Sequence, residues 1–147
     1  MTAMSMTVPL LRGDVLHFLG YRGRGTPAPR TEEALQSALE EARRLVVPRG
    51  VHRVVPSECA GELRLKARAR PCLALGLVTV GPGLEERVSE LLERGEHTQA
   101  LLLDAAGSAA AEEAADELER RIHGGVAVRW LEGPNSGRTI PRKLFGG

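Results

Sequence analysis

The chain has 147 residues, the length of a single domain that buries about two thirds of its unfolded surface in one core. Its net charge is +1, which excludes the basic footprint of a nucleic-acid-binding protein and any strong attraction to an anionic membrane. Two cysteines without a metal-ligand spacing favour reduced thiols in a cytoplasmic protein, and no apolar run approaches the roughly 20 residues of a membrane helix.

The first eight residues contain neither a basic patch nor a long apolar core, so we expect a disordered leader rather than a secretion signal. The single domain is then expected to cover residues 9–147. Leu11, Val15 and Phe18 recur at helical spacing, and Gly20 can end this first helix in the left-handed conformation.

A second helix is predicted from Thr31, a residue type that caps helix N-termini, to the region before Pro48. Glu32 and Glu33 follow the cap, where the helix dipole favours negative charge. An apolar stripe along this segment predicts one buried face. It consists of Ala34, Leu35, Ala38, Leu39, Ala42, Leu45 and Val46.

Residues 51–55 and 62–66 are predicted strands on either side of a turn at 57–61. The run L-A-L-G-L-V-T-V at 73–80 has no charge and predicts a strand covered on both faces. Consecutive strands without a crossover helix favour an antiparallel sheet. We therefore expect an α+β fold, with a twisted antiparallel sheet flanked by helices.

The segment Gly81-Pro82-Gly83 precedes a predicted helix with Leu84, Val88 and Leu91 on one face. It favours a tight turn with proline at the first helical position, and an anion site at the helix N-terminus is the alternative. An alanine-rich helix is predicted from about residue 98 to 122, and V-A-V-R-W-L at 126–131 alternates like a final strand.

Three polar residues of the alanine-rich helix, Asp104, Ser108 and Glu112, recur every four residues and therefore share one face. Such a stripe at the edge of a cleft could accept hydrogen bonds from an amine or from ribose hydroxyls, and a face turned to water is the alternative interpretation. The four histidines have no carboxylate or cysteine partners at useful spacing, so no catalytic or metal motif is evident.

Two motifs, T-V-G-P-G-L-E-E-R-V and L-L-L-D-A-A-G-S-A-A-A-E, occur in this order between residues 79 and 112. In residue sequence and spacing they resemble the activation domain of cobalamin-dependent methionine synthase, including short free-standing bacterial relatives of that domain. The resemblance implies an antiparallel sheet with helices and a site for S-adenosylmethionine. Glu112 falls on a glutamate near that site in the family.

The family's R-x-x-P-G-Y signature has its nearest match at residues 129–134, R-W-L-E-G-P. By resemblance, Arg129 would pair with the methionine carboxylate of the cofactor, and Gly133 would take the place of the signature glycine. The proline has become Glu132 and the tyrosine has become Pro134. Glu132 would compete for the Arg129 guanidinium, which is otherwise suited to a bidentate carboxylate contact.

The resemblance implies a non-catalytic activation subunit that presents S-adenosylmethionine to cobalamin held by a partner, so that the cobalamin can be reduced and remethylated. The partner would be a cobalamin-binding methionine synthase or another corrinoid protein. The alternative is a diverged protein–protein module that docks on a corrinoid protein and has lost the S-adenosylmethionine pocket. Self-association as a homodimer is open under both hypotheses.

Overall fold

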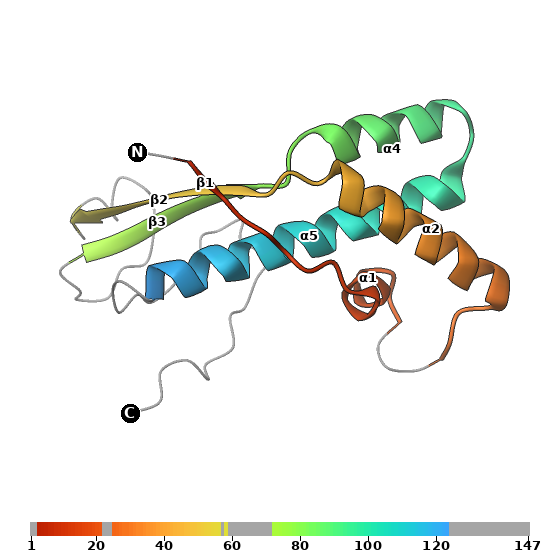
Figure 1. Ribbon diagram of the computed structural model, residues 1–147, viewed down its shortest axis with the longest axis horizontal. Coiled ribbons are helices and arrows are strands. Elements are labelled where there is room, and N and C mark those ends of the chain that lie inside the picture. Colours follow the sequence, from red (N-terminus) through yellow and green to blue (C-terminus); the bar gives the residue numbers. More distant parts are fainter. Residues whose placement is uncertain (1–2, 22–24, 57, 59–71, 124–147) are drawn as a thin grey trace.

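The computed structural model describes residues 3–21, 25–56, 58 and 72–123, and these form one α+β unit (Figure 1). The predicted fold class is confirmed: the described elements are helices and one antiparallel sheet, and the last described helix packs against the sheet. In chain order the elements are β1 (Met4–Ser5), α1 (Arg12–Phe18), α2 (Pro29–Leu45), β2 (Arg49–Pro56), β3 (Cys72–Thr79), α4 (Gly83–Glu93) and α5 (His97–His123).

The sheet has the order β1-β2-β3, and both pairings are antiparallel. β2 and β3 pair along their full lengths, from Arg49 opposite Thr79 to Pro56 opposite Cys72. The predicted strands at 51–55 and 73–80 therefore exist. Those at 62–66 and 126–131, and most of the turn at 57–61, lie outside the described residues.

The expectation of a disordered leader over residues 1–8 is wrong from residue 4 onward. Met4 and Ser5 form β1 opposite Gly50 and Arg49, and the Met6 N–H donates to the Pro48 carbonyl over 3.0 Å. The Met6 side chain is buried, and its Cε would lie 3.0 Å from a Cβ added at Gly50. Glycine at this position therefore lets the leader lie close to β2.

The sheet is covered on one face among the described elements, so the prediction that β3 is covered on both faces is wrong. Ala74 and Val78 pack with Ala114, Leu118 and Ile122 of α5. Leu77 points the other way and is 72% exposed. The uncharged sequence of β3 therefore does not reflect burial on both sides.

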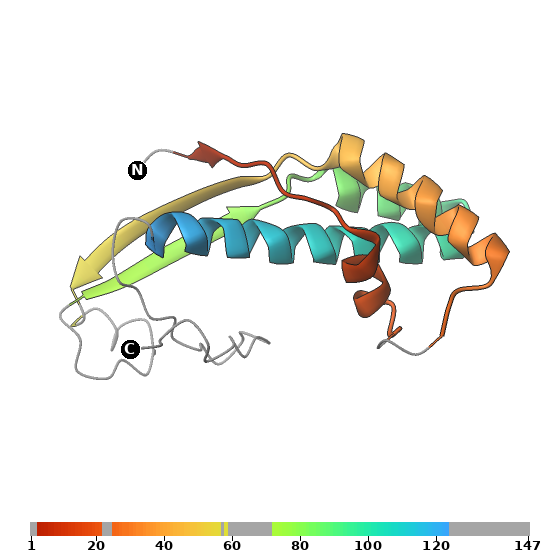
Figure 2. The same ribbon diagram turned by 60° about the horizontal axis from the view of Figure 1, so that its bottom comes forward.

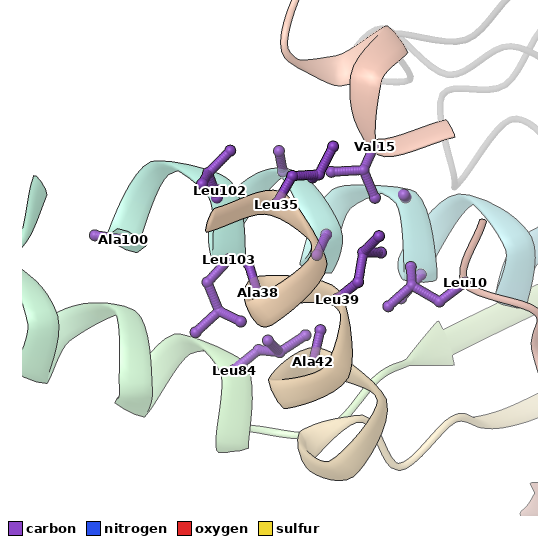
Figure 3. Packing of buried hydrophobic residues seen from close by; sticks show 14 of the residues in the cluster. Leu10, Val15, Leu35, Ala38, Leu39, Ala42, Leu84, Ala100, Leu102 and Leu103 are labelled. Atoms are coloured by element: carbon purple, nitrogen blue, oxygen red, sulfur yellow. The ribbon is translucent and has the colours of Figure 1, made fainter. Parts of the chain in front are cut away.

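α5 is the axis of the molecule (Figure 2). Its second half lies along the sheet, and its first half continues beyond the sheet, where α1, α2 and α4 surround it. Figure 3 shows Leu35 and Leu39 of α2, Leu84 of α4 and Val15 of α1 converging on Leu103 and its neighbours. The core is aliphatic, and the many alanines of α5 let these helices approach closely.

The start of α2 differs from its prediction. The helix begins at Pro29, Ala28 is the N-cap residue without a side-chain cap, and Thr31 lies inside the helix. Proline is favoured at the first helical position, because its missing N–H needs no partner there and its φ angle is already helical. Pro29, rather than Thr31, therefore marks the start of α2.

Ion pairs connect the described helices across the surface. The guanidinium of Arg12 in α1 donates from Nε and Nη2 to the two carboxylate oxygens of Glu32 in α2, over 2.6 and 2.7 Å. Arg87 of α4 donates from Nε to Glu41 of α2 over 2.6 Å. The first pair has the bidentate geometry of the stronger arginine–carboxylate contacts.

Candidate functional site

Three of the predicted ligand-binding residues lie on α5, one helical turn apart. Asp104 is exposed, and Ser108 and Glu112 are half-buried. Residues four apart on a helix lie on the same side, so the three polar groups form a short row along the middle of α5. Leu101, three residues before Asp104, is 61% exposed. The row therefore begins at a surface that the described elements leave open.

The other two predicted ligand-binding residues, Arg129 and Gly133, lie outside the described residues. Whether Arg129 and Gly133 lie close to the polar row of α5, as the resemblance implies, therefore stays a prediction. Of the predicted site, the described residues include only the three on α5.

Small residues on another side of α5 fix the position of this polar row. Leu84 of α4 and Leu103 of α5 lie against each other in Figure 3. A Cβ added at Gly107 would lie 3.3 Å from Leu84 Cδ1. Because a contact at this distance leaves little room for a larger side chain, we infer that close packing against α4 fixes the orientation of α5.

Carboxylates from α1 and α5 gather beside the polar row. Burial raises the pKa of Glu113, and the charges of Asp116, Asp14 and Glu112 raise this pKa further, while Arg120 lowers it. Asp14 belongs to α1, and its Oδ2 atom is buried without a hydrogen-bond partner among the described residues. The surroundings of Glu113, the residue after Glu112, are therefore acidic, and they suit a cationic group better than a phosphate.

Sequence reasoning missed the contribution of α1 to this acidic region. Asp14 lies within the predicted first helix, but no pattern in the sequence indicates which part of the chain that helix contacts. Only the packing of α1 across α5 brings Asp14 near Glu113. In the sequence, the one indication of this role is that Asp14 lies among the apolar positions of a short helix.

The Gly81-Pro82-Gly83 segment is a tight turn between β3 and α4. Gly81 has a φ of +82°, and its N–H donates to Thr79 Oγ1 over 3.1 Å. A Cβ at Gly83 would lie 3.2 Å from the carbonyl oxygen of Leu45. Both glycines are therefore explained by backbone geometry and close packing. Pro82 is the N-cap residue, one position before the first helical position that we predicted for it.

In the part of the chain that the structure describes, no group of three or more histidine, cysteine or acidic side chains could hold a metal ion. His17, His52 and His97 are exposed, and His17 and His97 lie at helix ends. Within the same part of the chain, no helix is both long and apolar enough to cross a membrane.

No model of a known protein family matches the chain, and no curated protein matches it.

Proposed function

We propose that the chain is an accessory protein that binds S-adenosylmethionine and presents it to cobalamin held by a partner protein in the cytoplasm. The observation that carries the proposal is the pair of motifs, T-V-G-P-G-L-E-E-R-V and L-L-L-D-A-A-G-S-A-A-A-E, which resemble the activation domain of cobalamin-dependent methionine synthase. They span the end of β3, the turn, the start of α4 and the polar row of α5.

The chemistry of α5 supports this proposal. S-adenosylmethionine carries a sulfonium cation, an ammonium group and ribose hydroxyls, all of which interact favourably with carboxylates. Asp104 and Glu112 supply carboxylates on one side of α5, with Ser108 between them. In the proposal Arg129 pairs with the ligand's carboxylate and the Gly133 backbone lies beside it. Methyl transfer is then the chemistry of the cofactors, and the chain contributes binding and orientation.

Calorimetric titration of the full chain with S-adenosylmethionine tests the proposal. We expect micromolar affinity, loss of measurable binding in Arg129→Ala, and at least tenfold weaker binding in Glu112→Gln, since each contact is charge-assisted. Glu93→Gln, an exposed change on α4, removes the same charge away from the polar row and is the matched control. Equal weakening by Glu93→Gln and Glu112→Gln would count against the assigned site.

A second function is favoured by one specific observation, the altered sequence R-W-L-E-G-P at residues 129–134. Glu132 there would oppose the binding of a ligand carboxylate to Arg129. In this case the chain is a protein–protein module that docks on a cobalamin-binding methionine synthase or another corrinoid protein without binding S-adenosylmethionine. No heat at millimolar ligand, together with retained binding to a cobalamin-loaded partner, would support this second function.

A further inference from the structure

In the described sheet β3 is an edge strand, and its own sequence lacks the features that usually protect an edge. Among the described strands, β2 occupies one side of β3 and nothing pairs with the other. From Cys72 to Val80 the sequence contains no charge and no proline. Free edges of natural sheets are normally blunted by charges, prolines, bulges or very short strands, because unpaired N–H and C=O groups bind further strands. An eight-residue uncharged edge is thus suited to pairing.

The face of the sheet that points away from α5 adds an apolar surface beside this edge. Leu77 is 72% exposed there and lies opposite Val51 of β2. Leu75 lies on the same face, opposite Arg53. The apolar side chains of this face thus lie on the edge strand β3, and the exposed Arg49 and Arg53 lie on the neighbouring strand β2.

We propose that β3 pairs antiparallel with β3 of a second copy of this chain, about a two-fold axis at Gly76. This register places Leu75 opposite Leu77 of the partner subunit and Ala74 opposite Val78 of the partner subunit. Facing residues then share a face of the joined sheet, so the apolar surfaces around Leu77 become continuous across the axis. A two-fold contact of this kind uses the same strand on both copies and closes on itself.

The charge distribution favours edge pairing over stacking of the two sheet faces. Neighbouring strands lie about 4.8 Å apart, so the two β2 strands of the dimer would be separated by three spacings, or about 14 Å. This exceeds the Debye length of about 8 Å at physiological salt, and the arginines of the two copies would hardly repel each other. Face-to-face stacking would instead point Arg49 and Arg53 of each copy at those of the other.

The opposite edge of the described sheet explains why pairing would stop at a dimer. That edge is β1, which is only two residues long, Met4 and Ser5. A strand of this length offers few backbone groups to a further copy. One long, uncharged edge and one short edge together specify a closed pair rather than a growing fibre.

Sedimentation equilibrium of the full chain from micromolar to millimolar concentration tests this proposal. We expect a monomer–dimer equilibrium, weakened at least tenfold in Leu77→Lys, which corresponds to about 1.4 kcal/mol. Leu92→Lys, at a leucine of α4 that is 49% exposed, introduces the same charge away from the edge and should leave the equilibrium unchanged. Circular dichroism checks folding, and if Leu77→Lys is unfolded, the milder Leu77→Thr decides by the same comparison.

Three outcomes would overturn the proposal. A wild-type chain that is monomeric throughout the concentration range would mean that β3 is not an interface between copies, as when residues 126–131 occupy the edge within one chain. A dimer that Leu77→Lys leaves intact would use another surface. Equal weakening by Leu92→Lys and Leu77→Lys would point to a general effect of charge.

Discussion

The charged form of Glu113 destabilises the folded protein, because its carboxylate is partly buried beside other carboxylates. Its pKa is raised by burial first and by Asp116 and Asp14 next, so folding favours its protonated form. Stability is therefore lost as pH rises from the unfolded pKa of about 4.5 through the higher folded value. We expect Glu113→Gln to raise the free energy of unfolding at pH 7 by about 0.5 kcal/mol, and to give no gain at pH 3.

Urea unfolding at these two pH values measures the effect of Glu113→Gln. Glu40→Gln, at an exposed position of α2, changes the net charge equally and serves as the control. If Glu40→Gln stabilised the protein as much as Glu113→Gln, the gain would come from net charge rather than from the local carboxylates.

Glu32 has the opposite dependence on pH. The side-chain hydrogen bonds from Arg12 and Gln36 lower the pKa of Glu32 to about 2. Because the folded pKa lies below the unfolded value, this stabilising contribution is complete above about pH 4.5 and is lost as pH falls toward 2. We expect Arg12→Gln to lower the urea midpoint at pH 6 and to leave it nearly unchanged at pH 2.

The control for Arg12→Gln is Arg30→Gln, which removes the same charge at an exposed position near the start of α2. A constant difference between Arg12→Gln and wild type from pH 6 to pH 2 would show that Glu32 does not depend on Arg12 for its low pKa.

At the scale of elements, the contact between α4 and α5 depends on the absence of a side chain at Gly107. Leucine in place of glycine in a helix gains roughly 0.8 kcal/mol in propensity, but at Gly107 it would collide with Leu84. We expect Gly107→Leu to destabilise the protein by about 1–3 kcal/mol through overpacking, measured by thermal unfolding.

The same substitution at Gly13 of α1 is the matched control, because an added Cβ there meets nothing within 4 Å. We expect Gly13→Leu to be neutral or mildly stabilising. A stable Gly107→Leu variant would mean that α4 can move away from α5, and close packing would then not fix the orientation of α5 as we infer.

At the scale of the whole molecule, the sequence predicts the helices and strands that have a clear local pattern. It misses the features that depend on contacts between distant parts of the chain. Consecutive β-type runs without a crossover helix predicted an antiparallel sheet, and alanine-rich periodicity predicted α5. The pairing of β2 with β3 was not predicted, because the sequence pattern favoured a hairpin between residues 51–55 and 62–66. β1 was missed because Met4 and Ser5 are too few to show a period. Leu77 was assigned to a buried face because an uncharged run does not show whether one or both faces of the strand are covered.

α5 joins two apolar clusters and should make the described unit unfold in one cooperative step. Leu103 belongs to the cluster with α1, α2 and α4, and Leu118 belongs to the cluster with the sheet. Both are fully buried, so we expect Leu103→Ala and Leu118→Ala each to cost about 2–5 kcal/mol with an unchanged denaturant m-value. Circular dichroism in urea should show a single transition for both variants. A separate early transition in Leu118→Ala alone would contradict this, because the sheet would then melt independently of the helices.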